Sequence, residues 1–212
     1  MRRLLTAAIA PALGIALLCL SAGPAGASTA RDMAQQSIDE CMRGRKASDR
    51  VERLHRFERG QLLAEQAIAL DDTLAAAHFG VVCNLGELLR VDGEKITSLL
   101  KLRRLLQEVD RTLEIDPNHD DALATKGTLL VKLPRLLGGD VRKGEAMLRR
   151  VLELDPNAVG TRLTLARCRL EAGDRGEAVA FATRALQIAS EQGRADKIDE
   201  AQGILAELGA AR

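Results

Sequence analysis

The sequence predicts an all-α protein: a right-handed superhelical solenoid of about four helical hairpins with a C-terminal capping helix. Similar phrases end successive helix-like runs, at residues 68–73, 113–118, 152–157 and 185–188. The aspartates of the first three phrases are 45 and 39 residues apart, and Ile188 of the fourth follows Leu154 by 34 residues. A repeat of this length in an Ala/Leu-rich chain is typical of stacked helical hairpins. No segment alternates apolar and polar residues as a strand would.

Small side chains recur at fixed distances before each phrase. The positions 4, 7 and 11 residues before the closing aspartate, with the equivalent positions of the fourth copy, are Ala67, Ala64 and Gly60; Thr112, Val109 and Leu105; Val151, Leu148 and Gly144; Ala185, Ala182 and Ala178. Such offsets keep the residues on one helix face, where small side chains allow another helix to approach closely. We therefore expect most of them to be buried at helix crossings.

This pattern resembles the tetratricopeptide (TPR) repeat, whose second helix carries small residues at these offsets and ends in proline. In the best copy, residues 159–190, Leu165-Ala166 stands at the family's Leu-Gly pair and Gly173-Asp174 at its inter-helix turn. Arg162 and Ala182 replace the family's bulky aromatics. The resemblance implies a stack of hairpins whose first helices line a concave groove, and it names no ligand.

Two narrower resemblances cover about residues 65–190 together. Residues 70–79, 93–96 and 115–117 look like the TPR-type domain of the regulator-of-microtubule-dynamics family. Residues 133–140 look like a segment of the T-component proteins that accompany some bacterial TRAP solute transporters. Neither stretch is a catalytic motif.

The first two hairpins are expected at residues 30–46 with 49–70 and 74–91 with 94–115. The turn of the first is basic, through Arg43, Arg45 and Lys46, and the turn of the second is formed by residues 91–93. The greater length of the second hairpin explains the 45-residue spacing.

The last elements are expected at residues 120–133 with 141–154, 158–172 with 175–189, and 194–208. Pro134 and the pair Gly138-Gly139 mark a longer turn in the third hairpin. Asp120 and Asp121 follow Pro117 and are expected to cap that hairpin's first helix. The helix at 194–208 is expected to cover the apolar end of the stack.

The N-terminus predicts export. Arg2 and Arg3 precede an apolar stretch, residues 4–20, and Ala25-Gly-Ala27 offers a small-x-small cleavage site. This is the pattern of a signal peptide, residues 1–27, followed by a TPR-like repeat domain at 28–212. An uncleaved membrane anchor is the alternative, against which the cleavage site argues. We expect a periplasmic or secreted chain with no integral membrane span after cleavage.

The charge balance argues against nucleic acid as a partner. The 31 Lys and Arg residues face 30 Asp and Glu, and loss of Arg2 and Arg3 with the signal would leave a net charge of −1. A chain with this net charge has no positive electrostatic field that would attract a polyanion such as nucleic acid. It also has no Trp or Tyr and only three Phe for base stacking.

Three of the four cysteines lie beyond the signal: Cys41, Cys83 and Cys168. An odd number cannot pair completely within one chain. Cys41 and Cys83 fall on the expected first helices of successive hairpins, which pack side by side, so a disulfide between them is the pairing to expect in an oxidising compartment. Three buried free thiols remain an equal alternative.

Catalytic motifs are missing from the sequence. His55, His78 and His119 fall in separate segments, and no HExxH, phosphate-binding Gly loop or GxSxG elbow occurs. Charged pairs such as Arg104 with Glu108 are interpreted as solvated faces. We therefore expect no enzyme, no cofactor and no metal.

The candidate site is the concave groove, and six residues of the expected first helices are assigned to it: Phe79, Arg90, Thr128, Lys132, Thr164 and Arg167. Such a mixed surface suits a peptide or another subunit, although ordinary solvent-facing residues remain the alternative. The predicted function is an exported, non-catalytic TPR adaptor for a protein or peptide partner in the cell envelope. The alternative function is an accessory subunit of a solute transport system that forms a homo-oligomer and helps to handle a small solute.

Overall fold

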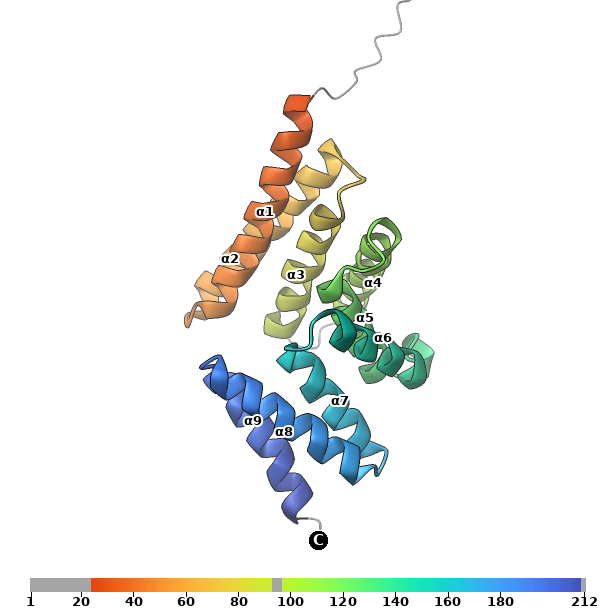
Figure 1. Cartoon of the computed structure of the whole chain (residues 1–212). Coiled ribbons are helices and arrows are strands. Elements are labelled where there is room, and N and C mark those ends of the chain that lie inside the picture. Colours follow the sequence, from red (N-terminus) through yellow and green to blue (C-terminus); the bar gives the residue numbers. More distant parts are fainter. Residues whose placement is uncertain (1–23, 93–96, 211–212) are drawn as a thin grey trace, which may run out of the picture.

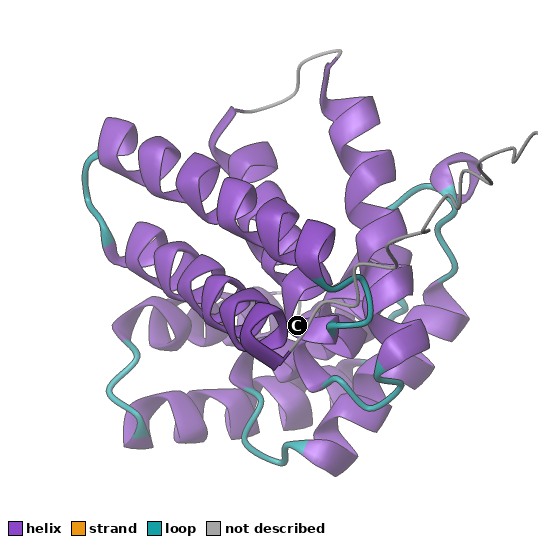
Figure 2. Cartoon of the chain, turned by 90° about the horizontal axis from the view of Figure 1, so that it is seen from above, coloured by secondary structure: helices purple, strands orange, loops and turns teal. Residues whose placement is uncertain are grey.

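The computed structural model describes residues 24–92 and 97–210, and within them it contains α-helices, one short 3-10 helix and no strand. The helices are α1 (Pro24–Lys46), α2 (Arg50–Leu70), α3 (Ala75–Asp92), α4 (Thr97–Ile115), α5 (Asp120–Lys132), η1 (Arg135–Leu137), α6 (Val141–Leu154), α7 (Val159–Glu171), α8 (Arg175–Glu191) and α9 (Ala195–Ala210). Successive helices pair as four antiparallel hairpins, and α9 packs on the last of them (Figure 1). Figure 2 shows the short loops that join them. The predicted all-α repeat fold is confirmed.

The predicted helix boundaries that fall on described residues agree with the structure to within three residues, except at α1. This helix begins at Pro24, so its first turn lies within the segment assigned to the signal peptide. Residues 1–23 of that segment lie outside the described part of the chain. The predicted start of a helix at residue 94 and the end of the predicted turn at residues 91–93 also lie outside the described part. None of the described helices is long and apolar enough to cross a membrane.

The start of α5 differs from the expectation. His119 is the N-cap residue, and its Nδ1 accepts a hydrogen bond from the backbone N–H of Ala122 at 3.3 Å. Asp120 and Asp121 lie one step too far along the chain to cap, because they already belong to the first helical turn. Their carboxylates still stabilise the helix there, since its N-terminus carries a partial positive charge.

Small residues allow close packing between the two helices of a hairpin and between neighbouring hairpins. The expected positions on α2, α6 and α8 are all buried: Gly60, Ala64, Ala67, Gly144, Leu148, Val151, Ala178, Ala182 and Ala185. A Cβ atom on Gly144 would lie 2.7 Å from the backbone oxygen of Gly127. That distance is too short for any larger residue, so α5 and α6 pack backbone against backbone.

The two ends of the array are closed differently. At the N-terminal end α1 packs against both α2 and α3, and the buried amide of Asn84 donates hydrogen bonds to Ser37 and to the backbone oxygen of Gly80. At the C-terminal end Ile204 and Leu208 of α9 complete an apolar cluster with α7 and α8. The predicted capping role of the last helix therefore agrees with the packing.

Candidate partner-binding groove

A hollow of about 320 Å³ lies between α5, α7 and α9, and we call it the C-terminal hollow. It is lined by Val131, Lys132, Leu163, Thr164, Arg167, Cys168, Glu171 and Glu200. Three of the six residues assigned from the sequence, Lys132, Thr164 and Arg167, thus meet in one place.

The charges in the C-terminal hollow are partly paired. The guanidinium of Arg167 donates two hydrogen bonds to the Glu207 carboxylate of α9, at 2.6 and 2.8 Å. Lys132 is exposed and has no ion pair with any residue that the structure describes. The Thr164 hydroxyl donates to the backbone oxygen of Gly160 at 3.1 Å. A ligand would therefore meet one unpaired ammonium group and one guanidinium held in place by α9.

The Cys168 thiol also faces this hollow, and its surroundings keep it unreactive. Burial raises the pKa of the thiol, and the nearby Glu171 carboxylate raises it further, while Lys132 acts in the opposite direction. A thiol with a raised pKa stays protonated at neutral pH, and the protonated form is a poor nucleophile. The raised pKa therefore disfavours the nucleophilic thiolate form of Cys168 in this hollow.

A second hollow, of about 340 Å³, lies where the two ends of the array approach each other, and we call it the mouth hollow. Its lining comes from α1, α2 and α3 on one side and from the start of α9 on the other: Arg45, Arg53, Glu87, Arg90, Arg194, Asp196 and Lys197. Figure 1 shows the turn between α1 and α2 close to the turn between α8 and α9. Arg90, assigned from the sequence, lies here and not with Lys132 and Arg167.

Phe79 and Thr128 line neither hollow. Phe79 is half-buried against the core of α3 and α4, and its ring centroid is 4.6 Å from that of His119. Thr128 is half-buried on α5. The assignment of Phe79 and Thr128 to a groove stays a prediction, although Phe79 packs in part against the core cluster of α3 and α4.

A disulfide joins α1 to α3. Cys41 and Cys83 are bonded through sulfur, with their Cα atoms 6.2 Å apart. One helical turn further along the same helices, Arg45 Nε donates to the Glu87 carboxylate at 2.8 Å. The disulfide and this ion pair are successive rungs between two neighbouring helices, and together they fix one side of the mouth hollow.

Residues 135–196 match the model of the tetratricopeptide repeat family. This segment is a tetratricopeptide repeat (TPR) region. A solved structure titled as the functional characterization of Pseudomonas aeruginosa pilF superposes with a TM-score of 0.58 at 16% identity, over 86% of this chain and 70% of that one. The thermophilic TPR protein TTC0263 of Thermus thermophilus gives 0.56 at 17% identity, over 84% and 99%. No curated protein sequence matches the chain.

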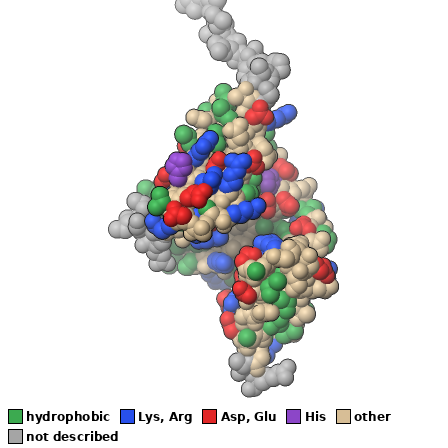
Figure 3. Space-filling view, turned by 90° about the vertical axis from the view of Figure 1, so that its left-hand side faces the viewer, with side chains coloured by type: hydrophobic (Ala, Val, Ile, Leu, Met, Phe, Trp, Pro, Cys, Tyr) green, Lys and Arg blue, Asp and Glu red, His purple; other side chains and the backbone are tan. Residues whose placement is uncertain are grey.

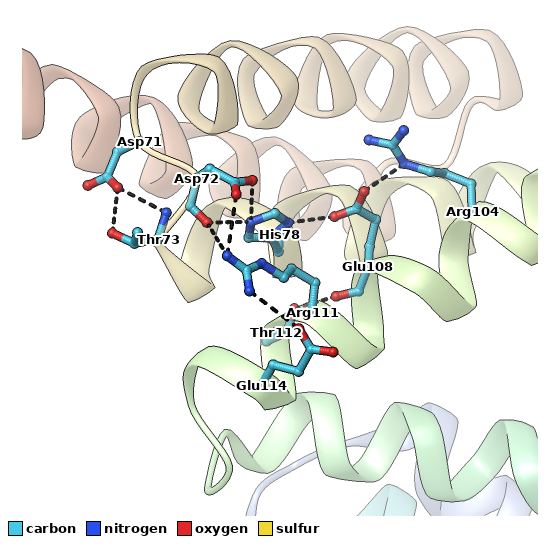
Figure 4. A network of polar contacts seen from close by, with 9 residues as sticks. All are labelled: Asp71, Asp72, Thr73, His78, Arg104, Glu108, Arg111, Thr112 and Glu114. Atoms are coloured by element: carbon cyan, nitrogen blue, oxygen red, sulfur yellow. Dashed lines mark hydrogen bonds and ion pairs between the residues drawn. The ribbon is translucent and has the colours of Figure 1, made fainter.

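A polar network around the buried His78 in the second hairpin could be mistaken for a catalytic site (Figure 4). The His78 side chain contacts a Glu108 carboxylate oxygen through Nδ1 at 2.6 Å and the backbone oxygen of Asp72 through Nε2 at 3.0 Å. Both ring nitrogens are thus engaged within the protein, which leaves neither for a substrate or a metal. No group of three or more metal-ligating side chains is found in the described part of the chain.

The same network corrects the interpretation of Glu108 as part of a solvated face. Arg104 does contact Glu108, at 2.6 Å, but Glu108 itself is only 7% exposed because its other carboxylate oxygen faces His78 on α3. The spacing of four residues between Arg104 and Glu108 is the same for a surface pair and for this half-buried one. Only the contact between Glu108 and His78 of α3 distinguishes the half-buried pair from a surface pair.

Proposed function

We propose that this TPR protein is a non-catalytic adaptor that holds a segment of a protein partner in its groove. The observation that carries the proposal is the C-terminal hollow, where successive hairpins place Lys132 and Arg167 beside each other. TPR folds are generally scaffolds, and the buried His78 network offers no free catalytic group. Binding is the activity that the remaining exposed chemistry supports.

The chemistry of the C-terminal hollow suits a peptide. The Lys132 ammonium can donate to a backbone carbonyl or a carboxylate, and the Arg167 guanidinium can do so in a bidentate manner. Val131 and Leu163 are apolar residues of the same lining. A helix-lined groove that offers both donors and apolar contacts is a usual setting for recognition of a short segment.

The test is charge reversal of the two cations together, Lys132→Glu with Arg167→Glu. Surface charges contribute little to stability, so the thermal melt should change little. Capture of the partner from envelope extract, with the bound protein identified by mass spectrometry, should be abolished. Undiminished capture would move the binding site out of the C-terminal hollow.

The matched control reverses the same amount of charge on a second helix, with Arg142→Glu and Arg150→Glu on α6. Both side chains are exposed and lie outside the two hollows. If this control also abolished capture, the effect would be one of net charge and not of the groove.

We further propose that the adaptor works in the cell envelope. The signal-like segment at residues 1–27 and the disulfide between Cys41 and Cys83 support this, because disulfides persist in oxidising compartments. N-terminal sequencing of the protein from fractionated cells should find a chain that begins near Ser28 outside the cytoplasm. A cytoplasmic chain that retains Met1 would contradict the proposal.

The alternative function, an accessory subunit of a solute transport system, rests on the resemblance of residues 133–140 and stays a prediction. Its requirement is a stable homo-oligomer, which light scattering on the purified chain would reveal. A monomer that captures one envelope protein would favour the adaptor.

A further inference from the structure

The mouth hollow has an excess of positive charge. Among the described residues that line it, five are cations and two are acids. The cations come from both ends of the array: Arg45, Arg53, Arg90, Arg194 and Lys197. Figure 3 shows the surface hollowed between the part built from the first helices and the part built from the last, with Lys and Arg side chains around the hollow.

On the N-terminal side, one carboxylate serves two guanidinium groups. Glu87 is 2% exposed, and it accepts from Arg45 at 2.8 Å and from Arg90 at 3.3 Å. The Arg90 side chain is nevertheless 74% exposed, and it lines the hollow. A single negative charge therefore leaves an unneutralised positive charge beside it.

Arg53 adds a third cation on this side, and it is only partly satisfied. Its Nε atom is buried and has no hydrogen-bond partner. A ligand in the hollow could not reach this buried atom. No ion pair joins Arg53 to any residue that the structure describes, so its positive charge adds to the excess around the hollow.

On the C-terminal side the pairing is also weak. Arg194 approaches Asp196 only to 3.9 Å, and the two side chains are 44% and 70% exposed. Lys197 contacts Glu200 at 2.7 Å, and Glu200 faces the neighbouring C-terminal hollow. Exposed pairs of this kind are easily exchanged for a better carboxylate.

We propose that the mouth hollow binds an acidic segment of the partner polypeptide, which is held between cations of the first hairpins and cations of α9. This inference rests on the proposed function, because the segment belongs to the partner held in the groove, and it adds the chemistry of that partner. A run of Asp or Glu side chains can reach both rims of a hollow of about 340 Å³. Arg favours such ligands because its planar donors match a carboxylate.

The disulfide prepares this site. Cys41 and Cys83 lie one turn before Arg45 and Glu87, so the covalent bond holds the two helices that carry the N-terminal rim. A rim that is fixed before binding loses less conformational freedom when the ligand arrives. The site is thus organised by α1 and α3 and completed by α9.

The experiment measures binding of a fluorescein-labelled peptide with six consecutive Glu residues to the full mature chain, by fluorescence anisotropy at low salt. The control peptide has Gln in place of every Glu. Two variants each remove one rim: Arg53→Gln with Arg90→Gln, and Arg194→Gln with Lys197→Gln. The control variant, Arg142→Gln with Arg150→Gln, removes the same charge from α6.

The Glu peptide should bind and the Gln peptide should not. Each rim variant should weaken binding by about tenfold or more, because charge-assisted hydrogen bonds are lost on one side, whereas the α6 control should bind as the wild type does. Binding should weaken as salt is raised.

Several outcomes would overturn the proposal. Equal binding of the Gln peptide would remove the need for acidic side chains, and an unaffected Arg194→Gln/Lys197→Gln variant would show that α9 takes no part. Competition by inorganic phosphate at the same concentration as the peptide would indicate a small-anion site. Equal binding to anionic phospholipid vesicles would indicate a membrane surface.

The result can be separated from a failure of the proposed function. The Lys132→Glu/Arg167→Glu variant should still bind the Glu peptide, since the mouth hollow is intact in it. If that variant loses the natural partner while the rim variants still bind it, the proposed adaptor function is supported. The proposal that the partner carries an acidic segment is then rejected.

Discussion

Gly60, which has no side chain, allows α2 to approach α3 closely. A Cβ atom on Gly60 would lie 2.2 Å from Oδ1 of Asn84. Asn84 cannot easily move away, because it is fully buried and its amide donates to Ser37 and Gly80. Gly60 is therefore needed for close packing even though glycine is a poor helix former.

Replacing glycine by alanine should change the stability of the protein in opposite directions at two positions, Gly203 and Gly60. In an exposed helix position Gly→Ala stabilises by about 0.5–1 kcal/mol, and Gly203→Ala on α9 should do so because nothing lies within 4 Å of its Cβ position. Gly60→Ala should instead destabilise by about 1–3 kcal/mol through overpacking. Guanidinium unfolding of the two variants measures both values. Equal stabilisation would mean that Asn84 yields at little cost.

Thr73 controls the titration of Asp71. Its hydroxyl and its backbone N–H donate to the Asp71 carboxylate at 2.6 and 3.0 Å, and these two hydrogen bonds lower the pKa of that carboxyl. A group whose pKa is lowered by folding stabilises the protein above its unfolded pKa, and that contribution is lost as the pH falls through the folded pKa.

Thr73→Val removes the hydroxyl and should raise the pKa of Asp71 toward its ordinary value. The variant should be less stable than the wild type at neutral pH, and the difference should vanish well below the folded pKa. NMR titration of the Asp71 carboxyl carbon and melts at the two pH values check this. An unchanged pKa would assign the shift to the backbone hydrogen bond alone.

At the scale of whole helices, a buried polar contact fixes α3 against α4. His78 and Glu108 are 3% and 7% exposed, and they meet at 2.6 Å although they are 30 residues apart. Buried groups of this kind are costly when they lose a partner, which makes the contact specific for one register of the two helices.

Glu108→Ala should therefore destabilise the protein by about 1–3 kcal/mol, because it leaves a nitrogen of the buried His78 ring without a partner. The matched control is Glu114→Ala on the same helix, which removes an exposed pair with Arg111 and should cost at most about 1 kcal/mol. Urea unfolding of both variants gives the comparison. If both changes cost the same, the His78 contact does not hold the helices together.

For the molecule as a whole, the helices could be predicted because their signals are local. The Asp-Pro phrases and the small residues on α2, α6 and α8 act within one or two turns, and the structure follows them closely. That Lys132, Thr164 and Arg167 lie near one another could be predicted for a similar reason, since they lie on the first helices of adjacent hairpins. Their role in binding stays a prediction.

The mouth hollow could not be predicted in this way. It brings Arg45 near Arg194, and their approach depends on the small rotation added by every hairpin between them. The turn through Pro134 and Gly138 lengthens the third hairpin and changes that rotation, and no local sequence pattern gives the total rotation. The burial of Glu108 was missed for the same reason, because it depends on a residue 30 positions away.

The bond between Cys41 and Cys83 also determines how far this chain can be stretched. The two cysteines are 42 residues apart in sequence, so a pulling force applied at the termini bypasses the segment between them while the bond is intact. Full extension should consequently be shorter by about 140 Å in the oxidised than in the reduced protein. Single-molecule force spectroscopy with and without reductant would measure the difference, and identical extensions would show that the thiols are not bonded. Under tension, the oxidised chain would thus keep α1 and α3 joined after the rest of the array had unravelled.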